Sequence, residues 1–340
     1  MPHDNAPEQS RVIGALLALH SGDSLGSTVE FRSHASIKKR YPDGLRDIIG
    51  GGPFSWAPGH ATDDTDMTRG ILLAYRDHQQ QRPLTGFTNS SPSVVQRAAE
   101  HFLCWLRGDW PGRELDSRPE DIGNATFIGL SNYARTRDPS TSGAGRGSAG
   151  NGSLMRCLPT GLFQEDAARL VEESLAISKI THNDERCTIA CAAYNVIISH
   201  LIRGVSPKEA IQAALDLSSD FEDSPSGPVS KAIALGTTVS LRDVAEKGPD
   251  AETFLDRCGG YVLDTLTLAI AALLDDRSLE DVLVDVVRVG NDTDTNGAVA
   301  GGLLGAKHGE SAIPERWSRE LQFGQEFREI ALQIMGTSKK

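Results

Sequence analysis

The sequence predicts an all-α protein built as a bundle of helices. Apolar residues recur at helical spacing in one segment after another, while alternating β-branched runs, which indicate strands, are nearly absent. The connections between the helical segments are short and polar, as is typical of helical bundles. No internal repeat of fixed period is present.

The helical segments follow one another from the N-terminus. Residues 11–20 are apolar, and the glycines that follow at positions 22 and 26 permit either a tight helix packing or a turn. Segments 42–59, 79–92 and 108–123 are rich in turn residues and are expected to be loops. Further helices are predicted at 67–78, 94–107, 126–135, 167–180, 187–203, 207–217, 229–241, 261–274, 279–289 and 297–305.

Two Thr/Asp clusters stand at predicted helix starts and give the strongest functional signal. The first reads Thr62-Asp63-Asp64-Thr65-Asp66-Met67, and the second reads Gly290-Asn291-Asp292-Thr293-Asp294-Thr295-Asn296. A helix N-terminus favours negative charge, and one threonine or aspartate makes a good N-cap. One cap needs only one side chain, however, and like charges this close repel unless a cation compensates them. Oxygen ligands at this density suit Mg²⁺ or Mn²⁺.

Composition narrows the class of protein. The 340 residues, with 39% hydrophobic and 24% charged side chains, are typical of a globular protein. A net charge of −12 argues against nonspecific nucleic-acid binding. Five irregularly spaced cysteines, together with a polar N-terminus that lacks a signal-peptide pattern, favour reduced thiols in a cytoplasmic protein. No apolar run is long enough to span a membrane, so no membrane partner is expected.

The most glycine-rich segment, residues 137–152, raises the question of a nucleotide. Residues 145–150 formally satisfy G-x-G-x-x-G, but no strand precedes them, so a dinucleotide-binding fold is rejected. Bare backbone N–H groups before a helix can still bind a phosphate. Residues 140–145 are expected to be a flexible linker.

Taken together, the motifs resemble those of the ADP-ribosylglycohydrolase family. This family includes the dinitrogenase-reductase-activating glycohydrolases and the ADP-ribosylhydrolases that act on modified arginine or serine. The resemblance covers roughly residues 10–330, and six motifs in the right order are far more specific than any one. They are Gly22-Asp23-Ser24-Leu25-Gly26 with Glu30; Gly51-Gly52-Pro53, Pro58-Gly59 and Thr62-Asp63-Asp64-Thr65-x-Met67; Asp121-Ile122-Gly123; Gly150-Asn151-Gly152-Ser153-Leu154-Met155-Arg156; Thr181-His182; and Gly290-x-Asp292-x-Asp294-Thr295.

The resemblance implies a compact orthogonal helical bundle with a dinuclear metal cleft. It implies one domain at residues 11–335 after a flexible N-terminus at 1–10. The cofactors would be two divalent metal ions, Mg²⁺ or Mn²⁺, whose four positive charges match the four negative charges of the ligand carboxylates. The implied ligands are Thr62, Asp63, Asp64, Asp292, Asp294 and Thr295.

The implied reaction is metal-dependent hydrolysis of the glycosidic bond of ADP-ribosylated substrates, which releases ADP-ribose. The transition state is oxocarbenium-like and needs a placed water. Catalytic candidates are Glu30, Asp63 and Asp294, of which Glu30 matches a glutamate on a loop over the site. Local sequence alone leaves Glu30 equally open to being a solvated loop carboxylate. For His182, a position near the ligand is favoured over the alternative of a structural hydrogen bonder in a helix-connecting turn. The implied substrate-binding residues are Gly123, Asn124, Gly147, Ser148, Asn151, Gly152 and His182.

Three positions depart from the family pattern. Asp66 adds a carboxylate that either lies behind the ligands or faces solvent, and Asn291 stands where glycine is common. Ala149 stands where some members use an aromatic residue to stack adenine. The adenine platform must therefore come from elsewhere, with Tyr133, Phe127 and Tyr261 as candidates.

The leading hypothesis is a hydrolase that releases ADP-ribose from an ADP-ribosylated protein modified on arginine, acting as a monomer. Alternatives on the same fold are hydrolysis of ADP-ribosyl-serine, O-acetyl-ADP-ribose or other 1″ derivatives. A non-catalytic ADP-ribose binder is a different class, but every metal position keeps an oxygen side chain, which favours an active enzyme. A dinuclear phosphoesterase would want histidine ligands, and the two clusters contain none.

Overall fold

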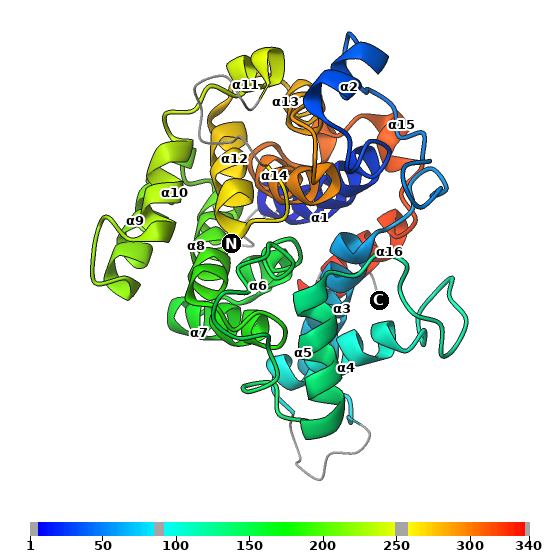
Figure 1. Cartoon of the computed structure of the whole chain (residues 1–340). Helices are drawn as coiled ribbons and strands as arrows, with labels where there is room; N and C mark the ends of the chain where they lie inside the picture. The colour runs from blue at the N-terminus through cyan, green and yellow to red at the C-terminus, as the bar shows by residue number, and fades with distance from the viewer. Residues whose placement is uncertain (1–5, 85–91, 249–257, 337–340) are drawn as a thin grey trace.

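The computed structural model describes residues 6–84, 92–248 and 258–336 (Figure 1). These residues form helices joined by loops, with isolated β-bridges but no strand among them, so the predicted all-α fold is confirmed. The helices are α1 (Ala6–Gly26), α2 (His34–Arg40), α3 (Asp63–Gln79), α4 (Val94–Leu106), α5 (Asn124–Thr136), α6 (Leu158–Phe163), α7 (Ala167–Lys179), α8 (Glu185–Ile202), α9 (Pro207–Phe221), α10 (Pro228–Gly236), α11 (Leu241–Lys247), α12 (Val262–Leu274), α13 (Leu279–Arg288), α14 (Thr293–His308), the 3₁₀ turn η1 (Glu310–Ala312), α15 (Glu315–Ser318) and α16 (Gly324–Ile334).

Helices α1 and α14 form the centre of the bundle and lie side by side although they come from opposite ends of the chain (Figure 1). Their backbones approach closely because glycines replace side chains where they meet. A Cβ on Gly22 would lie 2.0 Å from the carbonyl oxygen of Gly297, and one on Gly301 would lie 2.2 Å from that of Ala18. The glycine at position 22 therefore serves tight helix packing rather than a turn, and this contact sets where α14 begins relative to α1.

Two groups of helices flank this pair and enclose the site. On one side α4 packs against both α3 and α5, while α6 to α10 form the other side together with α12 (Figure 1). One continuous apolar core joins the groups, with fully buried side chains such as Phe102, Tyr194 and Trp317. The glycine-rich loop before α6 and the loop before α5 lie between the two groups, where the site is found.

Two predictions about local order need correction. Residues 6–10, expected within a flexible N-terminus, belong to α1, and the backbone N–H of Glu310 donates to the Ser10 hydroxyl; residues 1–5 lie outside the described part. The expected linker at 140–145 is anchored, because Ser142 is fully buried and Ala144 exchanges backbone hydrogen bonds with Thr181 and Asn183. Tertiary contacts, which glycine content does not reveal, order this segment.

Candidate active site

The two Thr/Asp clusters meet at the N-termini of α3 and α14. Thr62 caps α3, because its side chain accepts a hydrogen bond from the Asp64 backbone N–H. The hydroxyls of Thr62 and Thr295 both donate to Oδ2 of Asp64, each at 3.3 Å. Asp64 is 1% exposed and so links the two helix starts, which are separated by more than 220 residues, inside the protein.

Asp23 on α1 holds the first cluster in place. Its Oδ2 accepts hydrogen bonds from the backbone N–H groups of Thr62 and Thr65 and, at 2.5 Å, from the Thr65 hydroxyl. Asp23 is fully buried, and burial raises its pKa to about 7. The sequence contained Asp23 within a motif without giving it a role; its position explains that role, because it fixes the start of α3 against α1.

A third carboxylate group gathers beside these helix starts. Oxygens of Glu30, Asp121 and Asp294 all lie within 4.8 Å of one another, although they come from the turn after α1, the loop before α5 and the first turn of α14. Asp121 was not among the predicted ligands, and its signal was the Asp-x-Gly motif just before a helix. We call the whole set the acidic centre: Glu30, Asp63, Asp64, Asp121, Asp292 and Asp294.

Burial and the charges of neighbouring carboxylates shift the pKa values of four of these carboxyl groups in the same direction. Burial, followed by the charges of Asp121 and Asp292, raises the pKa of Glu30 to about 9. The pKa of Asp121 is raised to about 6, chiefly by burial. Burial, followed by the charges of neighbouring carboxylates, holds the pKa values of Asp63 and Asp294 well above their usual range. The protein alone therefore disfavours the charged forms of Glu30, Asp63, Asp121 and Asp294.

These raised pKa values, caused chiefly by burial, predict how the stability of the metal-free protein depends on pH. The folded state binds Glu30, Asp23 and Asp121 protons at pH values where the unfolded chain has released them, so the free energy of unfolding should fall as pH rises from about 5 to 9. Thermal unfolding in EDTA at pH values across this range measures the change in stability. Adding Mg²⁺ or Mn²⁺ should reverse the slope, and a metal-free stability that rises over this range would contradict the prediction.

The residues of the acidic centre fit bound divalent cations. Among the described residues, Oδ1 of Asp64, Oδ1 of Asp294 and Oε2 of Glu30 are buried without a hydrogen-bond partner. No described lysine, arginine or histidine forms an ion pair with any member of the centre. Buried carboxylate oxygens without donors or counter-charges are what hard cations bind.

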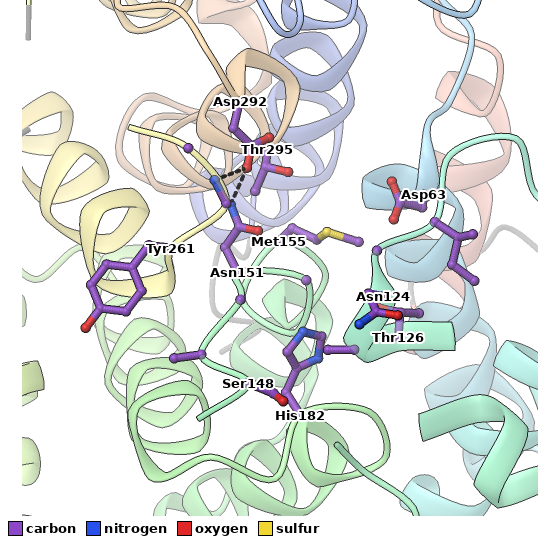
Figure 2. A pocket seen from close by; sticks show the side chains of 18 of the residues that line it. Asp63, Asn124, Thr126, Ser148, Asn151, Met155, His182, Tyr261, Asp292 and Thr295 are labelled. Carbon is purple, nitrogen blue, oxygen red and sulfur yellow. Dashed lines mark hydrogen bonds between the residues drawn. The ribbon is translucent and has the colours of Figure 1, made fainter. Parts of the chain in front are cut away.

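A cavity of about 980 Å³ opens from the acidic centre (Figure 2). Most of the predicted site residues line it, including Asp63, Asp292, Asp294 and Thr295. Ser148 and His182 lie across the cavity from Asp292 and Thr295 (Figure 2). Thr62 and Asp64 lie behind this wall. The predicted substrate residues that line the cavity are Gly123, Asn124, Gly147, Ser148, Asn151, Gly152 and His182.

Two of these residues make contacts that the sequence did not predict. The Asn151 side-chain amide donates to Oδ2 of Asp292 at 2.7 Å, and the Gly260 backbone N–H donates to the same oxygen at 2.9 Å (Figure 2). Asn151 thus orients a predicted metal ligand. The backbone N–H of Gly147 donates to Asp184 at 2.7 Å, so this group is already engaged within the loop.

A chain of hydrogen bonds from the core fixes the ring of His182. The buried Arg156 guanidinium, which can only donate, bonds to the Thr181 hydroxyl oxygen at 2.6 Å. The hydroxyl hydrogen of Thr181 is then available to Nδ1 of His182, 2.8 Å away. Burial, helped by the Arg156 charge, lowers the pKa of His182 to about 3, so the ring is neutral at pH 7. We expect the Nε2–H tautomer, which presents a hydrogen-bond donor in the cavity wall.

Removing the middle of this chain should weaken ligand binding without touching the cavity. In Thr181→Val, the Arg156 N–H loses its acceptor and Nδ1 of His182 loses its donor, so the tautomer is no longer fixed. We expect about a tenfold loss in affinity for ADP-ribose, measured by calorimetry, and a changed ¹⁵N shift pattern of the His182 ring. Thr181→Ser keeps the hydroxyl and should bind as the wild type does; equal losses in both variants would contradict this role.

Comparisons with known proteins agree with this geometry. The sequence profile described as ADP-ribosylglycohydrolase matches residues 4–340. The chain belongs to the ADP-ribosylglycohydrolase family. Members are hydrolytic enzymes that cleave glycosidic linkages of ADP-ribose. The chain is therefore an enzyme of this class, a hydrolase of ADP-ribose glycosidic linkages.

Three relatives of the ADP-ribosylglycohydrolase family illustrate the likeness. The chain is 31% identical over 326 residues to ADP-ribosyl-[dinitrogen reductase] glycohydrolase of Rhodospirillum rubrum, covering 95% of this chain and 94% of that protein. It is 28% identical over 339 residues to ADP-ribosylarginine hydrolase Tri1 of Pseudomonas putida, covering 96% and 79%. A solved structure titled ADP-ribosylglycohydrolase-related protein complex superposes with a TM-score of 0.74 at 28% identity, covering 98% of this chain and 100% of that chain.

Within this ADP-ribosylglycohydrolase, the three aromatic residues that were candidates for stacking adenine lie in different places. Tyr261 lines the main cavity, whereas Phe127 lines a separate small pocket and Tyr133 is buried with its hydroxyl donating to Glu100. Arg186, not predicted, also lines the main cavity, and its Cζ lies 5.8 Å from the Tyr261 ring centroid.

Asp66 is hydrogen-bonded to two tryptophan side chains. Its two carboxylate oxygens accept hydrogen bonds from the indole N–H groups of Trp105, at 2.9 Å, and Trp110, at 2.7 Å. Burial raises its pKa to about 7, and the two indoles oppose that shift. Asp66 therefore ties α3 to α4 and to the loop after α4.

No helix in the described ranges combines the length and apolar character needed to cross a bilayer.

Proposed function

We propose that this enzyme is a divalent-metal-dependent hydrolase that releases ADP-ribose from ADP-ribosyl-arginine in a modified protein. The observation that carries the proposal is the convergence of Glu30, Asp121 and Asp294 at one end of a nucleotide-sized cavity. The names of two relatives, an ADP-ribosylarginine hydrolase and a dinitrogen reductase glycohydrolase, support the substrate class. A cytoplasmic monomer stays our prediction.

The cavity offers a different group for each part of ADP-ribose. The 13-residue helix α5 starts at Asn124 with no side-chain cap at Gly123, so its free N–H groups and dipole suit the pyrophosphate. Tyr261 and Arg186 offer a stacking surface for adenine. The ribose that carries the scissile bond then reaches the acidic centre.

Two Mg²⁺ or Mn²⁺ ions would act here as Lewis acids that orient the ribose hydroxyls and lower the pKa of a bound water. The residues that would hold them are Thr62, Asp63, Asp64, Asp292, Asp294 and Thr295. Asp121 and Glu30 also reach this position. The protein's own part is to hold those ligands: Asn151 orients Asp292, and Thr295 and Thr62 orient Asp64.

Hydrolysis breaks the bond between the anomeric carbon and the arginine nitrogen. A water oxygen bonds to that carbon, the water loses a proton to a carboxylate, and the departing nitrogen gains a proton, which yields ADP-ribose and an unmodified arginine side chain in the protein. Glu30, Asp63, Asp121 and Asp294 are the carboxylates near enough to move that proton.

Turnover of a substrate panel tests this function. Arginine-linked protein, serine-linked peptide, O-acetyl-ADP-ribose and poly(ADP-ribose) would be incubated with Mg²⁺, Mn²⁺ or EDTA, and free ADP-ribose measured. The proposal expects metal-dependent release from the arginine-linked protein, lost in Asp63→Ala. Binding of ADP-ribose without any turnover would instead support a binder, and turnover of another member alone would reassign the leaving group.

The adenine assignment has its own test. Tyr261→Ala removes the aromatic face and should raise KM for the preferred substrate about tenfold with little change in kcat, because stacking of a base is worth about 1–3 kcal/mol. Phe127→Ala, outside the main cavity, serves as the control. Equal effects of the two substitutions on KM would contradict the assignment.

A further inference from the structure

A second cavity of about 290 Å³ lies on the other side of the acidic centre from the nucleotide-sized cavity. Asp63 and Asp121 line both cavities and therefore stand between them. The second cavity is formed by the start of α3, the loop that leads to it and the loop after α4. Its volume suits one side chain rather than a nucleotide.

The second cavity carries more negative than positive side chains. Five carboxylates and two arginines line it: Asp63, Asp66, Glu114, Glu120, Asp121, Arg113 and Arg118. The arginines have other partners, since Arg113 donates to the backbone oxygens of Trp105 and Ser117, and the Cζ of Arg118 lies 5.4 Å from the ring centroid of Phe127.

The unpaired carboxylates among the described residues of this cavity belong to Asp63, Glu114, Glu120 and Asp121, and Glu120 and Asp121 are adjacent in the chain. Asp66 is already bonded to two indoles. Among the described residues, Glu120 and Asp121 make no side-chain hydrogen bond and no ion pair. Glu120 is exposed, whereas Asp121 is half-buried beside Glu30 and Asp294.

A row of aromatic rings joins the two cavities. Phe31, at the mouth of the first, has its ring centroid 6.4 Å from that of Phe54, which lies 5.3 Å from Trp56, and Trp56 stacks on His60 at 4.2 Å in the wall of the second. Phe31 is 66% exposed, which is unusual for phenylalanine. Planar cations pack on such aromatic faces.

We propose that the second cavity is the acceptor-side subsite, which binds the guanidinium of the modified arginine between Glu120, Asp121 and the Trp56–His60 pair. The inference rests on the proposed function, because it assumes that ADP-ribose occupies the larger cavity with its anomeric carbon at Asp63 and Asp121. The substrate class follows from chemistry: a planar cation with several N–H donors matches free carboxylates beside aromatic rings.

Comparison of a cationic with a neutral leaving group tests this subsite. Glu120→Gln keeps the shape of the side chain and removes its charge. It should raise KM for the arginine-linked substrate about tenfold and leave turnover of serine-linked peptide within about twofold. Glu172→Gln, an exposed position on α7 outside both cavities, should change neither. Equal losses on both substrates, or none on the arginine-linked one, would overturn the proposal.

A binding measurement keeps this test independent of turnover. Arginine methyl ester should shift the NMR signal of the Trp56 indole N–H, assigned with Trp56→Phe, whereas the methyl ester of citrulline, its neutral urea analogue, should not. Absence of a shift with the arginine ester, or equal shifts with both, would refute the subsite. Failure of the proposed function looks different: no substrate of the panel would release ADP-ribose, while the ester titration would still decide the subsite.

Discussion

Replacement of Asp294 with asparagine is expected to lower kcat for ADP-ribose release at least about a thousandfold. Asp294 is 2% exposed, its Oδ1 has no partner among the described residues, and it lies within the carboxylate group that includes Glu30 and Asp121. An amide in its place removes one charge from a centre that needs all of its charges to hold divalent cations. Kinetics with saturating Mg²⁺ or Mn²⁺, together with metal content by mass spectrometry, measure the loss.

The same substitution should have the opposite effect on metal-free stability. Asp294→Asn removes one of several mutually repelling buried carboxylates, so its melting temperature in EDTA should be higher than that of the wild type, while the increase produced by Mg²⁺ should shrink. Asp220→Asn, on the exposed face of α9, is the matched control and should alter neither value. A variant that binds metal and turns over substrate like the wild type would rule out Asp294 as a ligand.

Alanine at Gly22 should destabilise the fold by at least about 3 kcal/mol. The new Cβ would lie 2.0 Å from the carbonyl oxygen and 2.3 Å from the carbonyl carbon of Gly297, so α1 and α14 must move apart. These atoms belong to backbone, which cannot move aside as a flexible side chain can. Because α14 starts at Thr293 and carries Asp294, the separation should also weaken metal binding. Urea unfolding and metal titration measure the two effects.

Gly145→Ala is the control for this substitution. Nothing lies within 4 Å of a Cβ at that position, so we expect a change in the free energy of unfolding of less than about 0.5 kcal/mol. A similar, small effect of both alanines would mean that the α1–α14 contact tolerates separation, and the close glycine packing would then not explain how the acidic centre is assembled.

Many of the site residues could be predicted from local sequence because they lie in short motifs. Thr62 and Asp64 follow the N-cap pattern of α3, and helix periodicity marked most of the long helices. Short helices such as α6 and α15 were missed, because six or four residues carry too little periodic signal. The last part of the chain, including α16, carried no motif and drew no prediction.

The sequence by itself determined the helical class of this protein, its two acidic helix starts and, through ordered motifs, its family. Only the tertiary structure decided that Thr295 and Thr62 share Asp64, that Asp121 joins the acidic centre, and that Arg156 acts on His182 through Thr181. The physical reason is distance along the chain. Capping and periodicity are set by neighbours a few residues apart, whereas the meeting of α3 with α14 depends on glycine contacts and core packing between segments hundreds of residues apart.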